Sequence, residues 1–278
     1  MKKTTTKERK DLTEIRHIIQ GIFVFVTLLL GVRHIMPERE STGGAFDAFC
    51  PMGGVETFIA YITTGQTLKT TTLLNFAILI GVLGVSLLAG RAFCGWFCPL
   101  GTLQDMFAGW AQRLCSGGKP KKRGMRSKSR FPILLPAKVD KWARYLKYLV
   151  LGIVIFASAY AVYPPLHEIC PARAVFGLQL TPLLASVLLT FVVTSLLVKR
   201  FWCKYLCPLG AFLAITNKFA PLRVTIDGQK CTECGRCDAE CPMDIEAIPE
   251  NMRNLECVQC LACVETCALA DVVVLKLG

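Results

Sequence analysis

The chain has 278 residues, of which 53% are hydrophobic, and it carries a formal net charge of +12. That apolar fraction is high for a soluble protein, and the length allows one or two domains. A secreted disulfide framework would spread the fifteen cysteines through loops, but eight of them fall within residues 231–267, so the composition excludes that class and indicates metal ligation.

Residues 1–14 form a basic tail, and four apolar stretches follow that are each about long enough to cross a bilayer as a helix. They cover residues 15–36, 73–90, 146–163 and 182–198. A buried core helix explains any one of these stretches, but it does not explain four that lack an amphipathic pattern. The sequence therefore predicts a membrane all-α domain over residues 15–220.

Lys and Arg residues decide the orientation of these predicted spans. They are frequent in the tail and in the loop 116–144, whereas residues 37–72 and 164–181 contain few of them. The positive-inside rule then predicts a multi-pass protein of the cytoplasmic (inner) membrane, with both termini in the cytoplasm. We expect the basic loop to face membrane lipids, and we expect no nucleic-acid partner.

The two halves, residues 15–115 and 145–220, repeat one order of motifs. Each has a Cys-Pro pair on the outer side, at Cys50 and Cys170, and then a Cys-x3-Cys-Pro-Leu-Gly motif on the inner side after the next span. Each half is thus predicted to be one helical hairpin of a parallel repeat, giving four transmembrane helices as two repeated hairpins.

The cysteines of these motifs allow several interpretations. If the hairpins pack symmetrically, the inner motifs bring together four cysteines, Cys94, Cys98, Cys203 and Cys207. This group could ligate a further iron–sulfur or metal centre, shape a quinone or flavin pocket, or supply structural thiols. The outer Cys50 and Cys170 could form a disulfide between the halves, or a redox-active or metal-binding pair.

The C-terminal region, residues 221–278, contains two runs of the form Cys-x2-Cys-x2-Cys-x3-Cys. This spacing is typical of the small α+β bacterial ferredoxin domain with two [4Fe–4S] clusters, in which the fourth cysteine of each run ligates the other cluster. Zinc binding through the same residues is the weaker alternative. The pattern assigns one cluster to Cys231, Cys234, Cys237 and Cys267, and the other to Cys257, Cys260, Cys263 and Cys241.

Together, the four spans, the inner motifs FCGWFCPLG and FWCKYLCPLG, and the paired ferredoxin runs resemble the NapH-type membrane ferredoxins, which are related to the NosR and CcoG proteins. The resemblance covers the chain from about residue 15 to residue 270. It implies quinol oxidation in the membrane, with electrons passed through the clusters to a redox partner. The outer Cys-Pro pairs lie outside that pattern, which argues against a nitrate-reductase role and favours a subfamily with its own outer-side chemistry. The chain also lacks the large extra domains of the NosR and CcoG types.

We therefore expect an electron-transfer subunit of a quinol dehydrogenase-type system, with quinone or quinol and a redox protein as partners. Its cofactors would be two [4Fe–4S] clusters, with quinone and a further metal centre as additional candidates. Two alternatives stay open: a maturation or metal-handling reductase that uses Cys50 and Cys170, and a redox sensor.

Overall fold

The computed structural model describes residues 6–35, 50–64, 73–115, 133, 135–160, 169–177, 181–245, 254–269 and 272–277. The first five residues of the predicted basic tail lie outside this part of the chain. So does most of the predicted basic loop, including all of its residues from Lys119 to Arg130.

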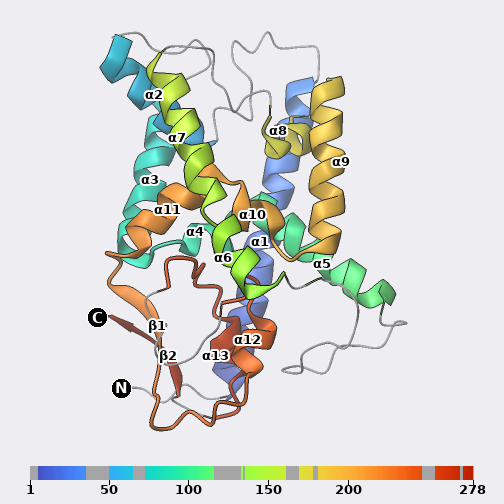
Figure 1. Ribbon diagram of the computed structural model, residues 1–278, viewed down its shortest axis with the longest axis vertical. Coiled ribbons are helices and arrows are strands. Elements are labelled where there is room, and N and C mark those ends of the chain that lie inside the picture. The colour runs from blue at the N-terminus through green and yellow to red at the C-terminus, as the bar shows by residue number, and fades with distance from the viewer. Residues whose placement is uncertain are drawn as a thin grey trace.

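The chain up to residue 220 is helical wherever it forms regular structure in the described part. The helices, in chain order, are α1 (Thr6–Ile35), α2 (Pro51–Thr64), α3 (Leu73–Ala89), α4 (Ala92–Trp96), α5 (Pro99–Cys115), α6 (Ala137–Ala143), α7 (Leu146–Ala159), α8 (Pro171–Phe176), α9 (Pro182–Leu197), α10 (Phe201–Tyr205) and α11 (Pro208–Asn217). Four of them, α1, α3, α7 and α9, run roughly along the long axis of the molecule (Figure 1). They cover residues 15–35, 73–89, 146–159 and 182–197 of the four stretches predicted to span a bilayer.

Two segments in the described part of the chain are long and apolar enough to cross a membrane, Leu12–Val32 and Ala137–Ala159. The second and fourth predicted spans form shorter apolar helices, Asn75–Ala89 and Pro182–Leu197. Only 11% of the first segment's apolar window and 22% of the second's is buried. A core helix of a soluble protein would be mostly buried, so these outward-facing apolar surfaces indicate a membrane protein.

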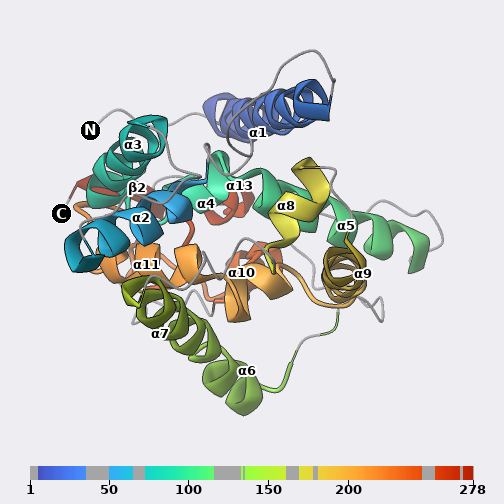
Figure 2. The ribbon, with the colours of Figure 1, turned by 90° about the horizontal axis from the view of Figure 1, so that it is seen from above.

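The other two upright helices also expose large apolar side chains. Ile80 of α3 is 68% exposed and Leu189 of α9 is 67% exposed, values similar to the 61% of Phe25 in α1 and the 64% of Phe156 in α7. Seen from above, the four helices stand apart around the shorter elements (Figure 2). Each helix therefore has one face toward the shorter elements and one apolar face toward the outside.

Every Cys-Pro pair of the two halves stands at the start of a helix. The cysteines at 50, 98, 170 and 207 directly precede α2, α5, α8 and α11, and each of these helices begins with the proline. Proline suits a first helical position because its missing N–H has no intrahelical partner there and its φ angle is already helical. The repeated dipeptide thus places each cysteine at a helix N-terminus.

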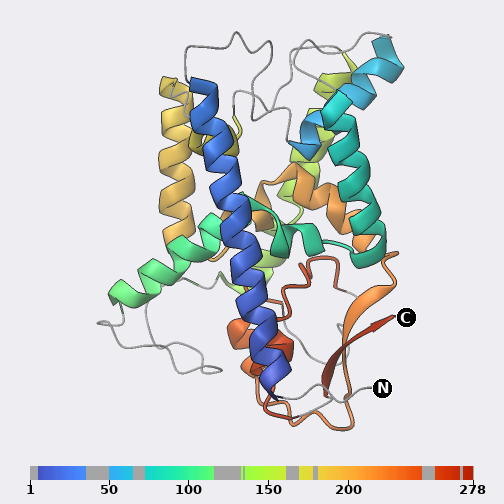
Figure 3. The same cartoon turned by 180° about the vertical axis from the view of Figure 1, so that it is seen from behind.

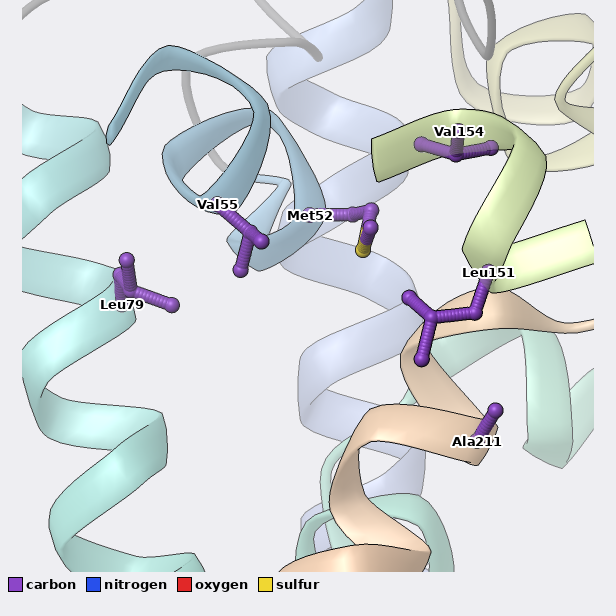
Figure 4. Close-up of a cluster of buried hydrophobic side chains, with 6 residues drawn as sticks. All are labelled: Met52, Val55, Leu79, Leu151, Val154 and Ala211. Carbon is purple, nitrogen blue, oxygen red and sulfur yellow. The ribbon is translucent and has the colours of Figure 1, made fainter. Parts of the chain in front are cut away.

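The interior of the helical region is divided between the two sides of the molecule. One cluster of buried side chains joins α2, α3, α7 and α11 (Figure 4); its members are Met52, Val55, Leu79, Leu151, Val154 and Ala211. A second cluster joins α5, α8 and α9 through Leu100, Ala172, Phe176 and Phe191. The first cluster includes Ala211, which follows the inner motif of the second half, and the second cluster includes Leu100 of the inner motif of the first half. The packing therefore holds these motifs between the upright helices.

The C-terminal region forms a small α+β unit below the helices. It contains β1 (Leu222–Ile226), α12 (Arg236–Glu240), α13 (Ala262–Thr266) and β2 (Val273–Leu277). The two strands pair antiparallel, from Leu222 opposite Leu277 to Ile226 opposite Val273. The N-terminal end of α1 reaches this unit (Figure 3), and Arg16 Nη1 donates to the Cys260 carbonyl at 2.8 Å. The start of α1 and the ferredoxin-like unit therefore lie at the same end of the molecule.

Candidate iron–sulfur centres

The two cysteine runs of the C-terminal unit fold into loops of the same backbone shape. In the first loop the residues on both sides of the middle cysteine, Glu233 and Gly235, have positive φ angles of 49° and 67°. In the second loop Gln259 and Leu261 occupy the same places, with φ angles of 47° and 59°. Alternating left-handed residues turn successive backbone N–H groups toward one concave side, which suits an anionic group. Holding non-glycine residues in this region is costly, and such strain is typical of binding loops.

The first loop and the end of the second run bring one set of four thiols together. Burial, followed by nearby charges, raises the pKa of the Cys237 thiol to about 11. Three of those charges belong to the rest of the first predicted set, Cys267, Cys234 and Cys231. Val264, Val272 and Val273 form the apolar support on which Cys231, Cys237 and Cys267 pack.

The second set is gathered in the same way around Cys263. Burial raises the pKa of that thiol well above its ordinary value, and the charges of Cys260, Cys257 and Cys241 add to the effect. Burial also raises the pKa of Cys241 to about 12, followed by the charge of Cys260. The cysteine that ends the first run therefore interacts with the thiols of the second loop, and four thiolates are the number that a [4Fe–4S] cluster needs.

Among the described residues, no group of three His, Cys, Asp or Glu side chains is arranged to hold a single metal ion. A zinc site needs all its ligands around one ion, whereas each thiolate of a [4Fe–4S] centre binds a different iron. The Cys-x2-Cys-x2-Cys-x3-Cys spacing of both runs is the pattern typical of cluster ligation.

The second loop is docked against the helical region by buried polar contacts. Glu256, which precedes Cys257, accepts a hydrogen bond from Arg91 at 2.7 Å and pairs with Lys147 of α7. Burial acts to raise the pKa of Glu256, but the charges of Arg91 and Lys147 outweigh it and hold that pKa below its ordinary value. Asn217 Nδ2, at the end of α11, lies within hydrogen-bond distance of the carbonyls of Asn254, Leu255 and Cys257.

The four inner cysteines also converge, and we call them the inner quartet: Cys94, Cys98, Cys203 and Cys207. Burial raises the pKa of Cys207, and the charges of the other three members add to it. Gln104 of α5 ties the two halves together at this point, because its Nε2 donates to Cys203 Sγ at 3.1 Å and its Oε1 accepts from the Trp202 N–H at 3.0 Å. The packing thus joins two cysteines from each half, which the sequence predicts only if the hairpins pack symmetrically.

Cys50 and Cys170, predicted for the outer side, are packed against helices that follow the inner motifs. Cys50 contacts the cluster that contains Ala211, and Cys170 contacts the cluster that contains Leu100. No disulfide joins them in the described structure. Burial, followed by the charge of Cys170, raises the pKa of Cys50 to about 12. A thiol with so high a pKa is a poor nucleophile at neutral pH, so Cys50 lacks the usual environment of a reactive cysteine.

Sequence reasoning missed the buried charged residues around these sites. Arg91 and Arg200 each stand three residues before the first cysteine of an inner motif, and both are fully buried. Arg200 pairs with Asp105 through two hydrogen bonds of 2.8 and 2.5 Å. The repetition of an arginine at this spacing was the available signal.

Comparisons with known proteins agree with this division of the chain. The family model described as a 4Fe–4S binding domain matches twice, at residues 71–116 and 180–226. The model described as a 4Fe–4S dicluster domain matches residues 223–268. The double match supports the internal repeat, and the dicluster match contains both C-terminal runs.

Several curated proteins are similar over most of the chain. The putative electron transport protein YccM of Escherichia coli is 25% identical over 96% of this chain and 75% of its own length. The ferredoxin-type protein NapH of Haemophilus influenzae is 27% identical over 74% of this chain and 71% of its own. The methylamine utilization ferredoxin-type protein MauN of Methylorubrum extorquens is 30% identical over 65% and 56%. No solved structure matches the chain. The duplicated match to the 4Fe–4S binding domain, the dicluster domain and the similarity to NapH together support a NapH-type 4Fe–4S membrane protein.

Proposed function

We propose that the protein carries electrons between the quinone pool of the cytoplasmic membrane and a redox protein, through two [4Fe–4S] clusters in its C-terminal domain. The observation that carries the proposal is the convergence of two four-thiol sets in adjacent loops of equal backbone shape. Such clusters, when bound, supply reversible one-electron transfer, with potentials that depend on their surroundings. Oxidation of one quinol releases two electrons and two protons, and two one-electron carriers can take the electrons in succession.

The membrane part of the proposal rests on the outward-facing apolar helices. With α1, α3, α7 and α9 as four transmembrane helices in two hairpins, a quinone could enter from the lipid near the inner motifs. The basic tail and basic loop would then place both termini and the ferredoxin domain in the cytoplasm. The contact of Arg16 with the Cys260 carbonyl supports a common side for the start of α1 and this domain.

The arrangement of the two sets also favours one order of the clusters along the electron path. Cys260 of the second set contacts the helical region, while Cys234 of the first set is exposed to solvent. Electron transfer slows steeply with distance, so the exposed first set is the better exchange point for a redox protein. Electrons would pass between the membrane and that partner by way of the second set.

The proposal is tested with the full-length, cluster-loaded protein in detergent under anaerobic conditions. A reduced quinol analogue is mixed with the oxidised protein, the oxidised quinone is mixed with dithionite-reduced protein, and low-temperature EPR follows the clusters in both. We expect electron exchange in at least one direction. Clusters that respond to dithionite but to no quinone or quinol would overturn the quinone step and leave cluster binding standing.

A reductase that works through Cys50 and Cys170 is the second candidate. The observation in its favour is the electrostatic proximity of the two thiols. The variants Cys50→Ser and Cys170→Ser separate the candidates, because a reductase would lose its activity on an external metal ion or disulfide, whereas quinone coupling would lose at most some stability.

A further inference from the structure

Two buried arginines lie beside the inner quartet, and each extends from its own half of the chain to the Cys-Pro loop of the other half. A β-carbon at Gly210, in the second half, would lie 3.0 Å from Arg91 Nη2 and 3.6 Å from the β-carbon of Cys207. A β-carbon at Gly101, in the first half, would lie 3.9 Å from Arg200 Cζ and 3.9 Å from the β-carbon of Cys98. Each arginine therefore reaches the Cys-Pro loop of the other half, and a side chain at Gly210 would press on Arg91.

The guanidinium of Arg91 has hydrogen-bonding capacity that the described residues do not use. Its Nη1 donates to Glu256, but its Nε and Nη2 are buried without a hydrogen-bond partner in the part of the chain that the structure describes. Glu256 is shared with Lys147, so two buried cations face one carboxylate. Leaving buried charged N–H groups unpaired is costly, which points to an anionic group beside Gly210 and Cys207.

Helix N-termini add to the positive potential at the same place. α5 and α11 both begin directly after a quartet cysteine, and the Gly210 N–H lies 3.3 Å from Cys207 Sγ. Backbone N–H groups of Leu100 and Gly101 act on Cys98 in the equivalent way. The combination of four thiols, two buried guanidinium groups and two helix starts suits a centre with four thiolates and a net negative charge.

We infer that the inner quartet binds a third [4Fe–4S] cluster, shared between the two halves, with Arg91 and Arg200 as its charge partners. Each 4Fe–4S binding domain match contains two quartet cysteines, so neither half supplies four thiolates there. A single shared site accounts for the double match. The inference concerns metal content, and it does not depend on the proposed quinone step.

The position of the quartet gives this centre a place in the electron path. A β-carbon at Gly95, next to Cys94, would lie 2.3 Å from the Val258 carbonyl oxygen and 3.5 Å from the Cα of Cys260. Trp96 Nε1 donates to the Gln259 carbonyl at 2.9 Å. The quartet therefore adjoins the loop of the second C-terminal set, and one electron could pass between the two centres, oxidising one as it reduces the other, with no bond or proton change.

The first test measures iron, acid-labile sulfide and zinc in anaerobically purified full-length protein. We expect about twelve iron atoms per chain in the wild type, three clusters of four, and about eight in Cys98→Ser and in Cys207→Ser. The matched control is Cys115→Ser, which removes a lone exposed cysteine and should keep the wild-type content. A wild-type content of about eight, or zinc bound in a quartet-dependent way, would overturn the inference. The wild-type value decides this even if the quartet variants fail to fold.

The second test asks whether the cluster is shared and whether Arg91 acts on it. Cys98→Ser and Cys207→Ser should abolish the same EPR signal and leave the signals of the C-terminal clusters; loss of two different signals would contradict a shared site. Arg91→Gln should move the midpoint potential of that signal to more negative values, because a nearby cation stabilises the more negative reduced state. Arg91→Lys should restore much of the shift. An unchanged potential in Arg91→Gln would exclude the role as charge partner.

Discussion

The C-terminal loops and the inner quartet assemble four thiols in opposite ways. In each C-terminal set three cysteines come from one short loop, and a single remote cysteine completes the set. In the quartet the two pairs are separated by more than a hundred residues along the chain, and helix packing joins them. A loop of fixed spacing can bring its three cysteines together locally, whereas the quartet forms only when the two halves of the chain are packed against each other. Damage to packing should therefore affect the quartet first.

The surroundings of the two regions differ as well. Cys94 and Cys203 of the quartet are buried beside buried arginines, while Cys234 of the first C-terminal set is exposed. Burial protects a redox centre from water and side reactions, and exposure permits contact with a partner. In the proposed electron path, the buried quartet is an internal carrier and the exposed first set is the exchange point at the surface.

The largest expected effect tests whether the fourth cysteine of each C-terminal run ligates the cluster held by the other run. Cys267→Ser should remove the cluster of the first set, with a loss of about four iron atoms, although Cys267 belongs to the second run. The double variant Cys267→Ser/Cys231→Ser should lose no more iron than the single one. By contrast, Cys267→Ser/Cys257→Ser should lose both C-terminal clusters. The opposite pattern of losses would show that each run holds its own cluster.

The next effect concerns the contact between the regions. Glu256→Gln removes the carboxylate shared by Arg91 and Lys147, and stranding two buried cations should lower the free energy of unfolding by about 3–5 kcal/mol. The measurement is thermal or denaturant unfolding of the protein in detergent. The matched control is Asp227→Asn, which breaks the exposed pair with Lys230 and should have no measurable effect. Equal stabilities of the two variants would mean that the buried network does not hold the regions together.

The smallest effect concerns backbone contact at the same boundary. Gly95→Ala introduces a β-carbon 2.3 Å from the Val258 carbonyl oxygen, and moving the loop should cost about 1–3 kcal/mol. Gly109→Ala is the matched control, because it lies in α5 with open space around the new carbon and should gain up to about 1 kcal/mol from helix propensity. Both are measured by the same unfolding experiment. A Gly95→Ala protein as stable as Gly109→Ala would show that the loop does not dock closely on the inner motif.

Much of the candidate C-terminal site could be predicted because its information is local. The spacing of the two runs predicts that Cys241 and Cys267 ligate across the loops, and in the structure the charge of Cys260 acts on Cys241 and that of Cys267 acts on Cys237. The upright helices were likewise predictable as apolar runs, although in the described part only Leu12–Val32 and Ala137–Ala159 are long and apolar enough to cross a membrane. The role of the outer cysteines could not be predicted, because their depth depends on how α2 and α8 pack.

The sequence by itself determined the type of chemistry, because thiol spacing within a few residues limits which irons each thiol can reach. It also determined the repeat, since each Cys-Pro pair of the two halves places a cysteine at a helix start. Only the tertiary structure decided that the inner cysteines meet, that Arg91 and Arg200 cross to the opposite halves, and that Glu256 joins the two regions. Buried charges are stable only beside partners, and those partners lie far away in the chain, where no local pattern records them.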